Sequence, residues 1–182
     1  MSSIEKSGWK VLRKHKEQDY GIAHSYELIL ERLRDGSQHP RVVFETPDWC
    51  NIIPVRRDGR IVMVRQLRFG IWRPSLEIPG GIVDPGEDPR AAAIRELAEE
   101  TGYRPREVIS LGSVHPNPAL QPNRIHSFLA LDCEEGDARP EHGEDIEVTT
   151  IGREEIPRLI SDGSISHALV VSAFYLEAIR AK

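Results

Sequence analysis

Apolar side chains near the start of the chain follow a spacing of mostly two, which predicts β-strands. This spacing covers residues 26–31. An Asp35-Gly36 turn signal separates them from a second predicted strand at residues 41–45. Residues 9–45 therefore predict a small antiparallel sheet. Its core would be thin on its own, so we expect it to pack on the rest of the chain or on a second chain.

The remaining pattern predicts a mixture of strands and helices. Strands are predicted at residues 51–55, 60–67, 108–114, 125–131 and 146–151, and helices at residues 153–161 and 167–180. Asp58-Gly59, between the first two of these strands, is a hairpin signal. We therefore divide the chain into an N-terminal β-sheet region, residues 1–47, and a main domain, residues 48–182.

A further helix is predicted at residues 91–100, directly after a glycine-containing turn. Asp88 is a favoured N-cap residue and Pro89 suits the first helical position. The segment consists mostly of strong helix formers, and Gly102 is a natural C-cap. The sequence thus predicts a loop followed by a well-capped helix.

This helix carries Glu96, Glu99 and Glu100 within about one and a half turns. Because positions i and i+4 share a helix face, Glu96 and Glu100 point the same way, with Glu99 beside them. Such carboxylates repel one another unless positive charge lies between them, and a hard divalent cation such as Mg²⁺ prefers their oxygen atoms. From the residues alone, a solvated helix with i,i+4 pairs such as Arg95–Glu99 is the alternative.

Residues 81–103 resemble the Nudix box, a motif of fixed spacing. Its constrained positions are filled here by Gly81, Glu87, Arg95, Glu96, Leu97, Glu99, Glu100, Gly102 and Tyr103. Tyr103 stands where the family usually has an aliphatic residue. At residue frequencies of roughly 5–10%, the fixed identities would coincide by chance in about one window in 10⁸. The resemblance implies an α/β/α sandwich with a mixed sheet, and an enzyme that hydrolyses nucleoside diphosphates linked to another group.

The same resemblance assigns roles within the box. It implies that Glu96 and Glu100 bind Mg²⁺, or Mn²⁺ as a substitute, with Glu99 and the Gly80 carbonyl as further ligands. Arg95 is expected to orient the catalytic glutamates through ion pairs. The metal would neutralise the charge of the diphosphate and lower the pKa of bound water.

The catalytic base is expected outside the box, in the acidic segment 141–147. Several relatives that act on nucleotide sugars supply it from such a loop. Glu144 is the first choice and Glu141 the second. Glu99 or a hydroxide on the metal is the alternative base, in which case this segment is simply a solvated acidic loop.

The flanks of the box resemble the ADP-ribose pyrophosphatase branch of the family. The resemblance rests on residues 64–68 and 75–81, on Pro118 and on the N-terminal sheet. It implies hydrolysis of ADP-ribose or a related nucleoside diphosphate sugar to a nucleoside monophosphate and a sugar phosphate. The sugar preference stays open, because Ala119 and Asn123 replace a glycine and a glutamate of many such enzymes.

Four residues are candidates for binding this substrate. Arg68 offers a two-pronged donor to a diphosphate, or it is an ordinary surface arginine. Glu77 holds substrate or a water on the metal, or it packs at a strand end. Trp49 stacks on the base, or it is a core or interface residue. Pro118 lies in a loop that touches the terminal sugar in relatives.

Composition narrows the possible partners. The length of 182 residues fits one domain with a small extension. A net charge of −5 argues against a nucleic-acid partner. No apolar segment suits a signal peptide or a membrane span, so we expect no membrane partner and a cytoplasmic location. Cys50 and Cys133 are expected to be reduced. The branch resemblance implies a homodimer in which the N-terminal sheet swaps between chains.

Two other functions stay open. One is a Nudix hydrolase for another substrate, such as a dinucleoside polyphosphate or a nucleoside triphosphate. The other is a module that senses a nucleotide without cleaving it. The sensing module is disfavoured, because such regulators often lose carboxylates of the box and this chain retains them all.

Overall fold

The structure, a computed structural model, describes residues 6–138 and 145–180. The chain divides into two compact units, each considered by itself below. The first contains residues 1–47 and 117–123, and the second contains residues 48–116 and 124–182. The segment that carries Pro118 thus groups with the first unit.

The first unit contains the small antiparallel sheet expected from the sequence. Its strands are β1 (Trp9–Asp19), β2 (His24–Arg32) and β3 (Gln38–Glu45), in the order β1-β2-β3. Phe44 donates a backbone hydrogen bond of 2.9 Å to the Leu120 carbonyl. Val11, Val42 and Phe44 remain exposed, as expected for a three-stranded sheet with little core of its own.

The second unit contains a seven-stranded mixed sheet. Its strands are β4 (Trp49–Arg56), β5 (Ile61–Arg68), β6 (Arg73–Glu77), β7 (Gly80–Ile82), β8 (Glu107–Val114), β9 (Ile125–Cys133) and β10 (Ile146–Ile151). Its helices are α2 (Pro89–Thr101), α3 (Ile156–Ser161) and α4 (Ala168–Arg180), with a 3₁₀ turn, η1 (Arg153–Glu155), before α3. The main path is β10-β5-β4-β9-β8, with β6 beside β5 and β7 beside β4. Strands β4 and β9 run parallel, and the other pairs are antiparallel.

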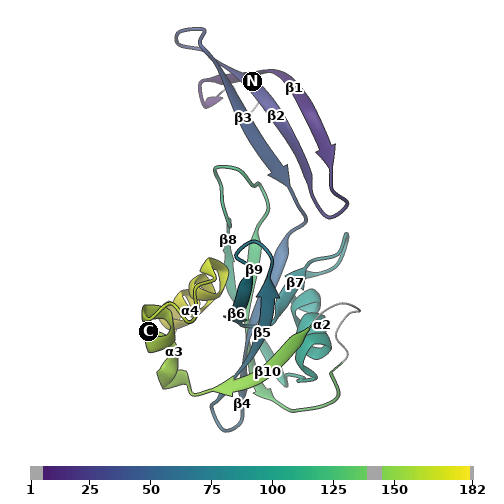
Figure 1. The fold of residues 1–182 in the computed structure, drawn as a ribbon, viewed down its shortest axis with the longest axis vertical. Helices are drawn as coiled ribbons and strands as arrows, with labels where there is room; N and C mark the ends of the chain where they lie inside the picture. The colour runs from purple at the N-terminus through teal and green to yellow at the C-terminus, as the bar shows by residue number, and fades with distance from the viewer. Residues whose placement is uncertain (1–5, 139–144, 181–182) are drawn as a thin grey trace. The chain divides into compact units, whose positions relative to one another are not determined.

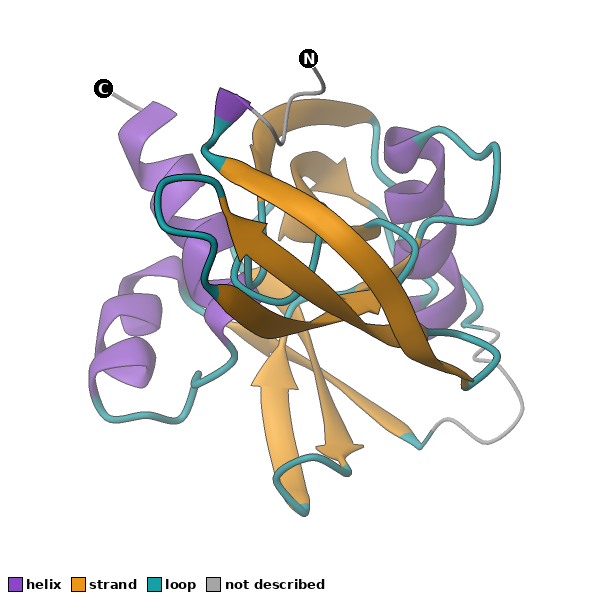
Figure 2. Cartoon of the chain, turned by 90° about the horizontal axis from the view of Figure 1, so that it is seen from above, coloured by secondary structure: helices purple, strands orange, loops and turns teal. Residues whose placement is uncertain are grey.

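Helices cover both faces of this sheet, which confirms the expected α/β/α arrangement. Figure 1 shows α2 on one side of the strands and α3 and α4 on the other, and Figure 2 shows the same helices in purple from above. Strand β4 explains the layering. Cys50 and Ile52 pack in the core cluster of α2, whereas Ile53 and Val55 pack in the cluster of α3 and α4. A strand buried on both faces reads as a continuous apolar run.

Helix α2 is capped as its sequence predicts. The Asp88 side chain accepts hydrogen bonds from the backbone N–H groups of Arg90, at 3.0 Å, and Ala91, at 3.1 Å. Gly102 ends the helix with φ of 77°, in the left-handed region. The caps fix where the helix begins and therefore which way its glutamates point.

The sequence pattern did not predict β6 or β7. The first is five residues long and contains Pro74, and the second is three residues long with two glycines. Neither offers enough alternation to indicate a strand. Among the described residues no helix is long and apolar enough to cross a membrane. Both cysteines are free and buried, as expected.

Candidate functional site

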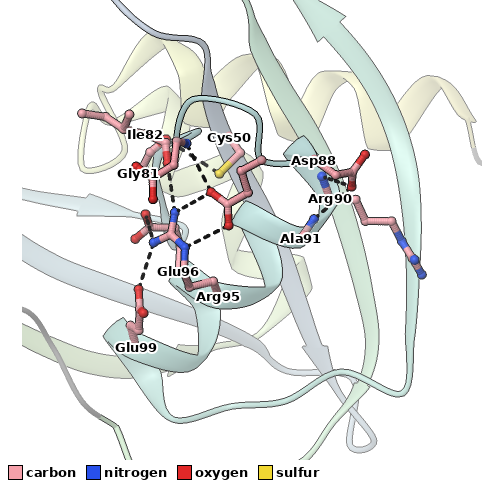
Figure 3. Close-up of polar contacts among 11 residues, drawn as sticks. Cys50, Gly81, Ile82, Asp88, Arg90, Ala91, Arg95, Glu96 and Glu99 are labelled. Carbon is pink, nitrogen blue, oxygen red and sulfur yellow. Dashed lines mark hydrogen bonds and ion pairs between the residues drawn. The ribbon is translucent and has the colours of Figure 1, made fainter. Parts of the chain in front are cut away.

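The guanidinium of Arg95 lies at the centre of the box. It donates to Glu87 at 3.1 and 3.0 Å, to Glu96 at 2.8 Å and to Glu99 at 3.0 Å. A further hydrogen bond of 3.1 Å reaches the Ile82 carbonyl in the preceding loop. Figure 3 shows Arg95 between Glu96 and Glu99. The structure therefore places Arg95 in contact with glutamates of both the preceding loop and α2.

The Arg95–Glu87 ion pair stays charged at neutral pH. The hydrogen bonds with Glu87 and the neighbouring glutamates raise the pKa of Arg95 further above its high ordinary value. In turn, the hydrogen bonds from Arg95 lower the pKa of Glu87. Each charge makes its partner harder to neutralise, so loop and helix are joined by full charges.

Two glycines allow the loop to approach the glutamates closely. Glu100 is buried, and its Oε2 accepts a hydrogen bond of 3.2 Å from the Gly80 backbone N–H. A Cβ atom on Gly81 would collide with the Glu96 carboxylate, and one on Gly80 would collide with the Cys50 carbonyl. A side chain is excluded at Gly80, where the colliding atom belongs to the backbone, whereas a Cβ on Gly81 would force the Glu96 carboxylate out of its present position.

The donor set of α2 fits a hard divalent cation, because Glu96, Glu99 and Glu100 supply carboxylate oxygens from one helix. As the side chains lie, no group of three His, Cys, Asp or Glu residues in the described part of the chain is close enough to hold a metal ion. Glu96 and Glu99 instead accept hydrogen bonds from Arg95, and Glu100 accepts one from the Gly80 backbone. Binding a cation would require Glu96 and Glu99 to share their oxygens between Arg95 and the ion.

A cavity of about 320 Å³ borders the glycines of the loop. It is lined by Trp49, Cys50, Asn51, Arg68, Glu77, Ile78, Gly80, Gly81, Ile82, Ile125, His167, Leu169 and Val170. The structure thus brings together four of the predicted residues, namely Trp49, Arg68, Glu77 and Gly80. We call this cavity the substrate pocket, after the role proposed for it under the proposed function.

Glu77 is the most buried charged group of the substrate pocket. Its side chain is 3% exposed and accepts two hydrogen bonds from Arg68, at 2.9 and 2.7 Å, and one of 3.0 Å from His167 Nδ1. Burial favours a raised pKa, but the hydrogen bonds from Arg68 and His167 outweigh it and hold the Glu77 pKa well below its ordinary range. Glu77 is therefore a carboxylate at neutral pH.

Some predicted residues lie elsewhere. Glu144 and Glu141 lie outside the described residues, so the structure gives no position for the expected base. Pro118 belongs to the first unit. Sequence reasoning missed His167, because a single histidine ahead of a helix carries no pattern. It also missed Asn51, whose signal was a polar residue inside the apolar run of β4.

We expect Glu77→Gln to destabilise the protein by about 2 kcal/mol at neutral pH, because Arg68 and His167 lose their carboxylate. The folded-state pKa of Glu77 is depressed, so its stabilisation is full above the ordinary glutamate pKa. It is lost as the pH falls through the folded-state pKa. Urea unfolding at several pH values measures the difference between the two proteins.

The matched control is Glu147→Gln, since Glu147 is 73% exposed and lies 3.8 Å from Arg65. It should change the unfolding free energy by less than about 0.5 kcal/mol. A difference between wild type and Glu77→Gln that stays constant from neutral to strongly acidic pH would contradict the prediction.

Comparisons with known proteins agree with this geometry. A model of the NUDIX domain matches residues 47–172. The ADP-ribose pyrophosphatase of Bacillus subtilis (strain 168) is 30% identical over 148 residues, covering 80% of both chains. The ADP-sugar pyrophosphatase of Mus musculus is 30% identical over 191 residues, covering 98% of this chain and 84% of that protein.

The fold also matches a solved structure. The crystal structure of an ADP compounds hydrolase aligns with a TM-score of 0.83 at 21% identity, covering 93% of this chain and 92% of that one. At this identity the likeness concerns the fold alone. The domain match spans the whole box with its glutamates, the glycine loop and every residue given above as lining the substrate pocket. From the capped helix, the arginine-centred cluster and this match, we conclude that the chain belongs to the Nudix family of hydrolases.

Proposed function

We propose that this protein hydrolyses the diphosphate bond of ADP-ribose or of a related nucleoside diphosphate sugar. With ADP-ribose, one water would be consumed and AMP and ribose 5-phosphate would be formed. The observation that carries the proposal is the substrate pocket beside the box. It shares Gly80 and Gly81 with the loop that the box glutamates contact. Similarity to an ADP-ribose pyrophosphatase and an ADP-sugar pyrophosphatase supports the same substrate class.

The metal of the proposed reaction is Mg²⁺, with Mn²⁺ as a substitute. Glu96 and Glu100 would hold it, with Glu99 and the Gly80 carbonyl as further ligands. When bound, the ion would neutralise diphosphate charge and lower the pKa of the attacking water. Arg95 keeps Glu96 and Glu99 aligned on α2 through its hydrogen bonds to both side chains.

The substrate pocket would hold the rest of the molecule. Arg68 presents a guanidinium at the pocket wall, held by its paired hydrogen bonds to Glu77, and suits a phosphate oxygen. Trp49 supplies an aromatic face for the base. Pro118 remains the candidate contact for the terminal sugar.

We expect Glu100→Gln to lower kcat on ADP-ribose by about 100-fold or more, because one anionic ligand is lost while the Gly80 hydrogen bond is retained. EDTA should abolish turnover, and Mg²⁺ should restore it. AMP release measures both effects. The matched control is Glu107→Gln, an exposed glutamate of β8, which should keep wild-type rates.

No turnover on ADP-ribose, GDP-mannose or similar compounds with Mg²⁺ or Mn²⁺ present would refute the proposal. Turnover on dinucleoside polyphosphates or nucleoside triphosphates alone would assign the protein to another substrate class within the family. Nucleotide binding without any turnover would indicate a sensing module.

Glu144 is the proposed general base, so Glu144→Gln should slow the chemical step by about 100-fold. Glu141→Gln should have little effect. Single-turnover hydrolysis of ADP-ribose compares the two variants. The opposite pattern would move the role to Glu141. Wild-type rates in both variants would leave Glu99 or a hydroxide on the metal as the candidate base.

The proposed active form is a homodimer in which the N-terminal sheet covers its exposed apolar side chains, such as Val42 and Phe44, against a second chain. Light scattering after gel filtration should then give twice the chain mass of 20.6 kDa. An active monomer would contradict this proposal and leave the hydrolytic function standing.

A further inference from the structure

The substrate pocket contains a histidine that the chemistry of the box does not use. His167 directly precedes α4, and its Nδ1 lies 3.0 Å from Glu77 Oε2. Glu77 also accepts both hydrogen bonds from Arg68. One buried carboxylate therefore holds two basic side chains that come from different parts of the sequence.

Glu77 fixes the orientation of the His167 ring. A carboxylate only accepts hydrogen bonds, so Nδ1 must carry the proton and donate it. The other nitrogen, Nε2, then lies on the far side of the ring. Among the residues that the structure describes, Nε2 has no hydrogen-bond partner. The side chain is 38% exposed and lines the substrate pocket, so its Nε2 edge is accessible to a ligand.

A protonated His167 would give the lining of the cavity a net positive charge, which suits an anion. Arg68 and Glu77, the one carboxylate among the described residues that line the cavity, balance each other's charge. Cys50 is neutral, since burial raises the pKa of its thiol to about 12. The N-terminal turn of the thirteen-residue helix α4 adds partial positive charge, with Leu169 and Val170 at the pocket wall.

A second side chain ties this helix end to the sheet. The Asn51 amide Nδ2 donates a hydrogen bond of 3.1 Å to the Leu169 carbonyl. Asn51 is 5% exposed, and its Oδ1 is buried without a hydrogen-bond partner in the described part of the chain. The contact holds the first turn of α4, and with it His167, against β4.

We propose that His167 is a second diphosphate-binding residue of the substrate pocket, with Nε2 donating to a phosphate oxygen while Glu77 holds Nδ1. This inference deepens the proposed function and rests on it for the identity of the full substrate. Arg68 and His167 then act as a pair of donors aligned by one carboxylate. The contact requires the imidazolium form of the ring, because only that form donates from both nitrogens.

The test measures binding of inorganic pyrophosphate by calorimetry, with EDTA present so that no metal contributes. His167→Asn is the informative variant, because its amide nitrogen replaces Nδ1 and retains the bond to Glu77 but nothing replaces Nε2. We expect His167→Asn and His167→Ala to weaken binding by about tenfold, the loss of one charge-assisted hydrogen bond.

His126→Gln is the matched control. His126 Nε2 lies 2.9 Å from Asp48 Oδ2, and the longer glutamine amide replaces Nε2, so this variant also retains its bond to a carboxylate. His126 is not among the residues that line the cavity. The control should bind pyrophosphate as wild type does.

A further measurement on the wild-type protein does not depend on how the variants fold. Pyrophosphate should shift the Nε2 NMR signal of His167, while Nδ1 keeps its proton. Wild-type affinity in His167→Asn, an unmoved Nε2 signal or no measurable pyrophosphate binding by wild type would each overturn the inference. Failure to hydrolyse ADP-ribose, with pyrophosphate binding still dependent on His167, would overturn only the proposed substrate.

Discussion

The organisation of the site depends on a single guanidinium, that of Arg95, which offsets the negative charge of several carboxylates. Arg95 bonds the carboxylates of Glu87, Glu96 and Glu99 and the carbonyl of Ile82. Without this cation, the glutamates of α2 and its preceding loop would repel one another at close range. With it, the loop is fastened to the helix at a defined distance. At that distance a Cβ on Gly81 would force the Glu96 carboxylate to move.

The box and the substrate pocket are connected through the same short stretch of backbone. Gly80 and Gly81 line the cavity, and the same residues meet Glu100 and Glu96 from the other side. A phosphate held by Arg68 would therefore lie near the end of the loop that contacts the glutamates. Positioning of this kind is the main contribution that a protein makes to phosphoryl chemistry.

Local signals made the box and its helix predictable. Asp88 and Gly102 set the ends of α2, and fixed spacing identified the glutamates and Arg95. The Glu77–His167 contact was not predictable, because 90 residues separate its partners and only the packing of α4 on the sheet joins them. Strands β6 and β7 were missed for a related reason. They are too short to show a period, and pairing with longer neighbours creates them.

The burial of β4 on both faces has a consequence for how the protein folds. Strand register is normally set by an apolar face and a polar face, but here both faces are apolar, so a slip by one residue costs little in hydrophobic burial. The polar and small residues must then select the correct alignment. Asn51 can reach the Leu169 carbonyl only from the α4 side, and its partner across the strand pair is Gly80, which tolerates no Cβ. A slip by one residue would turn Asn51 to the α2 face of the sheet and break its hydrogen bond to Leu169.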